Sequence, residues 1–210
     1  MRKPMQQGTD EWLKARAGKF TASRFADLMA VTKSGPSASR QNLITTLALE
    51  RITGQPVATY VNEAMQRGTE LEPVARAEYE ALTGEWVDLV GFAQDEHWPY
   101  VGVSPDGLLG DDGLIEIKCP YSQAKHLEAL RRGAHAVEYK WQVQGQMWIT
   151  GRQWCDVVSF DPRFPEGLQL AITRVKRDDE AIAKLAKACE DAEREVCEVV
   201  RQLTQLRDSN

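Results

Sequence analysis

The chain has 210 residues, 42% of them apolar and 27% charged, with a formal net charge of −5 at neutral pH. This length and composition predict one globular domain that forms its hydrophobic core without disulfides or structural metals. No apolar run approaches the length that a bilayer requires, and residues 1–4 lead into polar sequence, so we expect neither a membrane span nor export.

Charge is distributed unevenly along the chain. Residues 1–61 carry nine basic and four acidic side chains, a balance of +5, whereas residues 178–210 carry nine acidic and five basic ones. A basic first third can attract a phosphate-bearing partner, although a merely solvated face gives the same pattern. The four cysteines form no CxxC pair, which indicates reduced thiols in the cytoplasm and argues against a disulfide framework or a zinc site.

Helical patterns dominate the beginning of the chain. Thr9 can cap a short helix that ends at Gly18, and Ser23 can cap a second helix that runs to about Ala30. Residues 32–39 are basic and rich in turn formers, so we expect a flexible stretch there.

Two longer helices are predicted next. One surrounds residues 43–49 and stops at Gly54, and the other spans residues 62–83. Pro73 lies within the second one, where it predicts a break or a fresh first turn.

After Gly84 the pattern changes to strands separated by turns. We expect strands at residues 86–92, 100–103 and 114–118, with residues 107–109 leading into a turn at 110–113. Helices at 122–132 and 136–150, strands at 154–160 and 168–175, and a long final helix at 178–206 follow. This order predicts a mixed α/β fold, with a central sheet and helices on its faces.

The segment with most chemical information contains Asp106, Glu116 and Lys118. Strand alternation puts Glu116 and Lys118 on one face and the neighbouring isoleucines on the other. A turn at residues 110–113 can fold the chain after Asp106 back onto this strand, so the three charged groups meet at one end of a hairpin. Two carboxylates and an ammonium suit a hard cation such as Mg²⁺ and an activated water, whereas an exposed salt bridge is the plainer alternative.

Further motifs surround this segment in a fixed order. They are TDEWLKAR (9–16), TAS (21–23), GxxxE (68–72), AR (75–76), SPDGL (104–108), EIKCP (116–120), QVQ (142–144), MW (147–148) and DPR (161–163). Over about residues 8–163, this pattern resembles the YqaJ-type viral recombinase and phage lambda exonuclease family, within the PD-(D/E)xK nuclease superfamily. The resemblance implies a restriction-endonuclease-like α/β fold in one nuclease domain over residues 1–210, with a core at about 8–175 and a C-terminal helix at 178–206.

The resemblance also implies a metal site. Asp106 and Glu116 would bind catalytic Mg²⁺ together with the backbone carbonyl of Ile117, and Glu72 would add a carboxylate at the metal centre. Two Mg²⁺ ions are implied, for which Mn²⁺ can substitute. Without the motif, Glu72 would be an ordinary solvated helical residue.

Two further active-site residues follow from the same resemblance. Lys118 would position and activate the attacking water, and Gln142 would lie near the metal and the nucleophile. For Gln144 we expect only a place on a polar helix face.

A second group of residues is implied to hold a 5′-terminal phosphate. Arg16 lies one helical turn beyond Trp12, and a guanidinium binds phosphate at two points. Ser23 and Ser104 would add hydroxyl donors, and Thr21 can join them. The plain alternatives are an N-cap for Ser23 and core packing for Trp12.

Other polar residues carry weaker signals. His97, His126 and His135 lack the spacing of metal ligands, so we expect them on the surface. Four basic residues could border a DNA track or simply form a solvated helix face, and these are Lys125, Arg131, Arg132 and Lys140. Lys33 and Arg40 flank the flexible stretch, where a basic loop could contact the backbone of duplex DNA.

The implied activity is a Mg²⁺-dependent 5′-to-3′ double-strand DNA exonuclease that releases 5′-mononucleotides and leaves a 3′ single-stranded tail for recombination by strand annealing. The implied partners are DNA ends with a 5′-phosphate, two further copies of the chain in a toroidal homotrimer, and a single-strand DNA annealing protein, in the cytoplasm of a bacterial or phage-infected cell. Two alternatives stay open: another PD-(D/E)xK nuclease, such as a structure-specific endonuclease or a RecB-like enzyme, and a catalytically inactive DNA-end-binding protein. An iron–sulfur version is disfavoured, because the cysteines lack cluster spacing.

Overall fold

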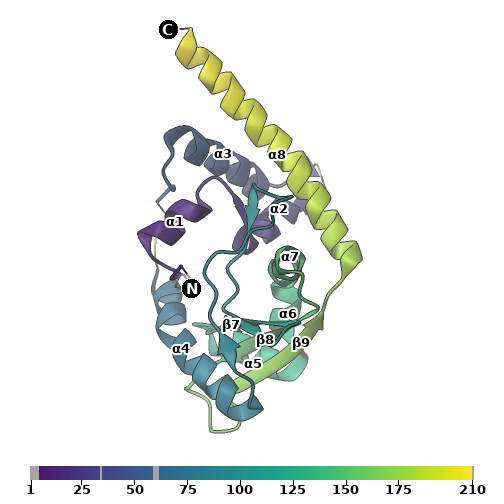
Figure 1. Ribbon diagram of the computed structural model, residues 1–210. Coiled ribbons are helices and arrows are strands. Elements are labelled where there is room, and N and C mark those ends of the chain that lie inside the picture. Colours follow the sequence, from purple (N-terminus) through teal and green to yellow (C-terminus); the bar gives the residue numbers. More distant parts are fainter. Residues whose placement is uncertain (1–4, 34, 59–61, 210) are drawn as a thin grey trace.

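The structure, a computed structural model, describes residues 5–33, 35–58 and 62–209, and a five-stranded mixed sheet lies at its centre (Figure 1). The strand order is β4-β6-β7-β8-β9, and neighbours are antiparallel except for the parallel pair β7 and β8. The strands are Val87–Asp88 (β4), Gly107–Leu109 (β6), Gly113–Lys118 (β7), Trp154–Phe160 (β8) and Leu170–Lys176 (β9). The expectation about export concerned residues 1–4, which lie outside the described ranges.

Helices and short extended segments surround this sheet. From the first half of the chain come α1 (Asp10–Arg16), β1 (Phe20–Thr21), the 3₁₀ helix η1 (Ala22–Arg24), α2 (Phe25–Met29), β2 (Val31–Thr32), β3 (Gly35–Pro36), α3 (Ala38–Thr53) and α4 (Glu63–Thr83). From the second half come β5 (Val101–Gly102), α5 (Gln123–Arg132), α6 (Ala134–Glu138), α7 (Lys140–Thr150) and α8 (Asp179–Asp208). The mixed α/β fold with a long C-terminal helix is thus confirmed.

Alternation along β7 divides its side chains between two hydrophobic cores. Ile115 and Ile117 pack on one face together with Tyr79 of α4. Leu114 packs on the other face together with Val143 of α7. Burying each large apolar side chain contributes about 1.5–3 kcal/mol, so this register is strongly specified. Glu116 and Lys118 alternate in phase with Leu114, so their side chains lie on the face of the sheet that α7 covers.

A third core joins α2 and α3 to α8. Two bidentate ion pairs reinforce the contact between α3 and α8: Arg40 with Glu195, at 2.6 and 3.0 Å, and Arg51 with Glu193, at 2.7 and 2.8 Å. The C-terminal part of α8 extends past the rest of the protein (Figure 1), where Leu206 is exposed. Within the described ranges, no helix has both the length and the apolar character needed to cross a membrane.

Several predicted boundaries are confirmed by local hydrogen bonds. The Thr9 side chain caps α1 by accepting the backbone N–H of Trp12, and Asn62 caps α4 in the same way. Gly54 ends α3 in the left-handed conformation, which glycine adopts without steric cost.

Other predictions about the helices are wrong. Ser23 lies inside η1 and does not cap α2. The N-cap position of α2 is occupied by Arg24, whose side chain makes no capping hydrogen bond. Pro73 neither breaks nor restarts α4, because the buried residues Ala75 and Tyr79 hold the following turns on the sheet. The predicted helix at 136–150 is two helices, α6 and α7, which meet at Tyr139.

The predicted strands and the predicted flexible stretch also need correction. The strand expected at 86–92 contains only Val87 and Asp88, and the one expected at 100–103 pairs with β1 instead of joining the central sheet. Residues 32–39 contribute to the short antiparallel pair of β2 and β3 and to the start of α3. Ser34 of that stretch lies outside the described residues.

Candidate active site

The β6–β7 hairpin brings Asp106 next to β7, as the sequence predicts. Gly107 pairs with Ile115, so the residue before Gly107 lies beside the end of β7. There, Asp106 Oδ2 accepts the backbone N–H of Ile117 at 2.6 Å. A Cβ atom at Gly107 would lie 2.1 Å from Val87 Cγ1, so only glycine permits this close contact between β6 and β4. Backbone geometry therefore fixes where the Asp106 carboxylate lies.

Glu116 is the most enclosed carboxylate of this group, with 2% of its surface exposed. Its Oε1 accepts hydrogen bonds from Lys118 Nζ at 2.5 Å and from Gln142 Nε2 at 2.6 Å, and its Oε2 accepts one from Gln146 Nε2 at 2.6 Å. A buried carboxylate needs such partners, because leaving it unpaired costs several kcal/mol. The two glutamines come from α7, which lies over this face of β7.

Lys118 is held by three neighbours. Besides Glu116, its Nζ donates to Gln142 Oε1 at 3.3 Å and lies 4.1 Å from the ring centroid of Tyr139. Burial acts to lower the pKa of Lys118, but the carboxylates of Glu116 and Asp106 outweigh it and raise the pKa above its ordinary value. The side chain is thus a fixed ammonium.

Glu72 approaches from α4 on the other side. Arg76, one turn further along that helix, donates from Nη2 to Glu72 Oε1 at 2.6 Å. Burial raises the pKa of Glu72, an effect that Arg76 opposes. Burial also raises the pKa of Asp106 well above its ordinary value, and the carboxylates of Glu116 and Glu72 add to this shift. The three acids therefore repel one another across a shared space.

That space is a cleft of about 660 Å³. Its walls come from the start of α4, the end of β7 and the residues that follow β7. The lining includes Met65, Gly68, Glu72, Asp106, Glu116, Ile117, Lys118, Tyr121, Lys125, His135 and Tyr139. The predicted metal and catalytic residues Asp106, Glu116, Ile117, Lys118 and Glu72 thus share one cleft, while Gln142 reaches it through Lys118 and Glu116.

These residues fit a hard divalent cation by the chemistry of their donor atoms. Within the described ranges, no three His, Cys, Asp or Glu side chains gather closely enough to hold a metal ion by themselves. Mg²⁺, however, usually takes one or two protein carboxylates and keeps waters or substrate phosphates as its other ligands. Asp106 and Glu116 supply two carboxylates whose mutual repulsion a cation would relieve.

The predicted phosphate-binding residues also come together. Arg16 of α1 points Nη2 at Thr21 Oγ1, 3.5 Å away, and at Ser23 Oγ, 3.4 Å away. These long contacts are weak, and the described residues place no carboxylate in ion-pair contact with Arg16. Burial lowers the pKa of Arg16 to about 10, which the carboxylate of Glu50 opposes, so the guanidinium stays charged at neutral pH. Most of its donor capacity is unused.

Trp12 connects this second cluster to the cleft. Its indole Nε1 donates to Ser104 Oγ at 2.9 Å, and the Arg16 guanidinium lies 4.0 Å from the centroid of its ring. Ser104 stands two residues before Asp106. The sequence therefore predicts correctly which residues gather, although Ser23 does so from η1 and not as a helix cap.

The prediction that all three histidines lie on the surface is wrong for two of them. His126 is fully buried, with Nδ1 2.8 Å from Ser159 Oγ and Nε2 2.8 Å from the carbonyl of Leu168. His135 is 3% exposed and also lines the cleft. His97 is exposed, as expected.

Gln144 and Gln146 are both buried, so the expectation that Gln144 lies on a polar helix face is wrong. Gln144 joins the end of β9 to the start of α8, since its Nε2 donates to the carbonyl of Lys176 and its Oε1 accepts the backbone N–H of Asp178. Gln146, which sequence reasoning missed, binds Glu116. Its spacing of four residues from Gln142 on a helix was the available signal.

The basic residues considered for a DNA track pair mainly with nearby carboxylates. Lys125 bonds to Glu138 and Lys140 to Asp178, while Arg131 and Arg132 both approach Glu128. Arg40 pairs with Glu195 in the α3–α8 contact. Of these cations, Lys125 also lines the cleft.

Comparisons with known proteins identify the family of the chain. The model of the YqaJ-like viral recombinase domain matches residues 11–153. The crystal structure of the alkaline exonuclease LHK-Exo from Laribacter hongkongensis shares 46% sequence identity, with a TM-score of 0.87 over 96% of this chain and 99% of that one. A second crystal structure of LHK-Exo, in complex with dAMP, superposes with a TM-score of 0.88 at the same identity and coverage.

A more distant crystal structure supports the fold. The phage-related exonuclease from Haemophilus somnus 129PT is 17% identical, with a TM-score of 0.72 over 88% of this chain and 96% of that one. No curated protein matches the chain. Since the family model covers more than half of the sequence and LHK-Exo matches nearly all of it, the chain belongs to the YqaJ-like viral recombinase family, whose nuclease fold it shares with an alkaline exonuclease.

Proposed function

We propose that the protein is a Mg²⁺-dependent exonuclease that digests one strand of double-stranded DNA from its 5′ end. It releases 5′-mononucleotides and leaves a 3′ single-stranded tail for recombination by strand annealing. The observation that carries this proposal is the short connection between the two clusters: Ser104 contacts Trp12 of the Arg16 cluster, and Asp106 lies in the cleft. Two residues span at most about 7 Å, so one short segment of a DNA strand can reach both clusters.

In this proposal the phosphodiester to be cleaved lies in the cleft beside Lys118. The Lys118 ammonium orients the attacking water and offsets the negative charge that develops on the phosphate. Gln142 bonds to both Lys118 and Glu116 and so keeps the two groups at a fixed separation. Gln146 holds the second oxygen of Glu116.

The proposed cofactor is Mg²⁺, as two ions, with Mn²⁺ able to substitute. Asp106, Glu116, the carbonyl of Ile117 and Glu72 are the residues that would hold it. Bound there, the cation would supply electrostatic stabilisation of the phosphate and lower the pKa of a water molecule.

The Arg16 cluster is the proposed receptor for the 5′-terminal phosphate. The charged Arg16 fork, the hydroxyls of Thr21 and Ser23 and the nearby Ser104 offer several donors to phosphate oxygens. Trp12 limits the freedom of the guanidinium by stacking on it. Binding of the terminal phosphate at this point would select 5′ ends.

The relatives support the chemistry and suggest the partners. LHK-Exo is an alkaline exonuclease, and dAMP, which it binds, has the chemistry of the proposed product. Membership of a viral recombinase family supports action with a single-strand DNA annealing protein in the cytoplasm of a bacterial or phage-infected cell. A toroidal homotrimer is the proposed assembly, which agrees with a basic first third and an acidic C-terminal helix.

A time course on linear duplexes, each strand labelled at one end in turn, tests the function. With Mg²⁺ we expect mononucleotides from the 5′-phosphorylated end of either strand and none without the metal. A covalently closed circle separates the alternatives, because a structure-specific or other endonuclease can cut it and an exonuclease cannot. Binding of 5′-phosphorylated ends without any release of nucleotides, with Mg²⁺ or Mn²⁺, would instead identify an inactive end-binding protein.

A further inference from the structure

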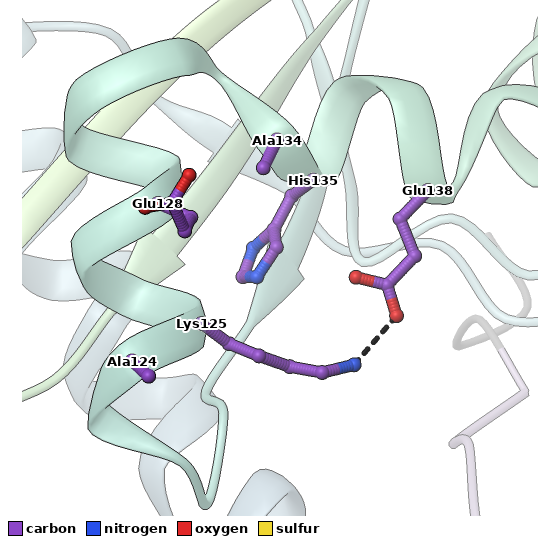
Figure 2. A pocket seen from close by; sticks show the side chains of 6 residues that line it. All are labelled: Ala124, Lys125, Glu128, Ala134, His135 and Glu138. Atoms are coloured by element: carbon purple, nitrogen blue, oxygen red, sulfur yellow. Dashed lines mark hydrogen bonds and ion pairs between the residues drawn. The ribbon is translucent and has the colours of Figure 1, made fainter.

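A smaller cavity lies beside the active-site cleft, between α5 and α6 (Figure 2). It has a volume of about 280 Å³ and is lined by Ala124, Lys125, Glu128, Ala134, His135 and Glu138. We call it the side cavity. Lys125 and His135 line both the side cavity and the cleft, so the two spaces adjoin.

His135 is the unusual member of this lining. It is 3% exposed, and neither ring nitrogen has a hydrogen-bond partner among the described residues. Figure 2 shows its ring directed into the space between the two helices. An unpartnered buried polar group costs about 1–3 kcal/mol, and native structures rarely contain one without a purpose. A ligand that bonds to the imidazole would recover this free energy.

The chemistry of the lining restricts what that ligand can be. No three metal-ligating side chains gather in the part of the chain that the structure describes, which argues against a metal ion. An anion finds no spare cation here, because Lys125 bonds to Glu138 at 2.6 Å and Glu128 bonds to Arg131 at 3.2 Å (Figure 2 draws the first of these pairs). A neutral ligand is therefore favoured.

The remaining features suit a planar ring with polar edges. The methyl groups of Ala124 and Ala134 offer apolar contacts. Burial lowers the pKa of His135, so its imidazole is neutral and offers one donor and one acceptor. The edge of a nucleobase presents donors and acceptors side by side. The volume lies just below the range of about 300–1,000 Å³ for drug-sized ligands, as suits a single ring system.

We propose that the side cavity is a base pocket, which takes the nucleobase of a nucleotide whose phosphate lies in the adjoining cleft, with His135 hydrogen-bonded to the edge of that base. The inference rests on the proposed nuclease function, since it assigns a place to part of the same substrate. The side cavity would contact the base of the nucleotide, whereas the cleft would contact its phosphate.

Binding of two probe molecules tests the proposal. These are dAMP and deoxyribose 5-phosphate, which lacks the base, and ligand-observed NMR measures the affinity of the full chain for each. We expect tighter binding of dAMP. His135→Phe keeps the bulk and burial of the ring but removes both nitrogens, so it should weaken dAMP binding about ten-fold and leave deoxyribose 5-phosphate unaffected.

A second variant fills the cavity without changing the histidine. Ala124 is exposed on α5, so Ala124→Phe can fold normally while its ring occupies the side cavity, and dAMP binding should weaken again. Leu127→Phe is the matched control, because Leu127 is an exposed residue of the same helix outside the cavity, and it should bind both probes as the wild type does.

The outcomes separate this inference from the proposed function. Equal binding of the two probes by the wild type, or unchanged dAMP binding in both His135→Phe and Ala124→Phe, overturns the base pocket even if the enzyme digests duplex DNA. A preference for dAMP that both variants remove supports the base pocket, and it would do so even if the wild type released no mononucleotides, a result that would overturn the nuclease function alone.

Discussion

Trp12 donates its indole N–H to Ser104 Oγ at 2.9 Å, and this bond ties α1 to the loop that carries Asp106. The same indole ring supports the Arg16 guanidinium, 4.0 Å from its centroid. One side chain therefore positions a charge for the proposed 5′-phosphate and restrains the segment that leads into the cleft. The residues proposed for end recognition and those proposed for cleavage are thus connected by a direct hydrogen bond.

Replacing Arg16 by Ala should remove most of the preference for 5′-phosphorylated ends. Charge-assisted hydrogen bonds contribute about 1.5–3 kcal/mol, so the ratio of initial rates on 5′-phosphoryl and 5′-hydroxyl duplexes should fall at least about ten-fold. Lys14→Ala is a suitable control, because Lys14 is an exposed cation on the same helix. If Arg16→Ala retained the full preference, the phosphate receptor would have to lie elsewhere.

Asp106→Asn should nearly abolish digestion without unfolding the protein. Asparagine keeps the shape of the side chain but removes the charge, and we expect a loss of rate of about a hundred- to a thousand-fold, as for other groups that stabilise charge in a transition state. Burial and two neighbouring carboxylates already raise the pKa of Asp106, so removing its charge should leave the melting temperature unchanged or higher. Lys118→Met should lose activity to a similar extent, and near-normal rates in either variant would refute these roles.

Gln144 and Gln146 should respond differently to the same substitution. Gln146→Ala removes a donor to Glu116, so the rate of digestion should fall about ten-fold with little change in substrate binding. Gln144→Ala removes two hydrogen bonds that Gln144 makes from α7, one with the carbonyl of Lys176 at the end of β9 and one with the backbone N–H of Asp178. It should therefore lower the free energy of unfolding by about 1–3 kcal/mol and leave the rate constant of the folded enzyme intact. Urea denaturation and single-turnover kinetics on both variants distinguish these outcomes, and a Gln146→Ala enzyme as fast as the wild type would contradict the assignment.

His135 should make stability depend on pH. Burial lowers its pKa, with Lys125, Lys118 and His126 adding to the shift and Glu138 opposing it. The unfolded chain protonates this histidine near pH 6.5, whereas the folded chain does so only at lower pH. Its contribution to stability is thus complete above about pH 6.5 and is lost as the pH falls from there through the folded-state pKa.

The size of that loss grows with the difference between the pKa values of His135 in the folded and the unfolded chain. Urea midpoints at pH 7.5 and pH 5.0 measure it, with His135→Phe as the comparison that lacks the titrating group. The wild type should lose more stability than the variant between these pH values. Equal losses would show that His135 titrates alike in both states.

Much of the site could be predicted because its determinants are local. Alternation along a single strand puts Glu116 and Lys118 on one face, and a glycine-rich turn returns the chain to Asp106 within about ten residues. Thr9 and Gly54 likewise mark helix ends through bonds to residues in the next turn. Physical reasoning on short segments captures such features well.

The rest depends on contacts between distant segments. The strand near residue 101 pairs with β1, about 80 residues earlier, and no local pattern indicates that partner. His126 is buried because Ser159 and the Leu168 carbonyl bond both of its nitrogens. Gln144 and Gln146 lie on the same helix but point in different directions, so Gln146 bonds to Glu116 whereas Gln144 bonds to Lys176 and Asp178. The packing of α7 on the sheet determines these directions.

Through Gly107, the edge of the sheet helps to define the geometry of the proposed active site. Any larger residue at this position would press on Val87 and force β4 and β6 apart, and the displacement would reach the neighbouring acid through one peptide bond. Strand β4 supplies none of the proposed active-site residues, yet its distance from the hairpin determines where the Asp106 carboxylate lies. Adding even a methyl group at position 107 should therefore lower the turnover rate. From its place in the sheet alone, Gly107 would be expected to have only a structural role.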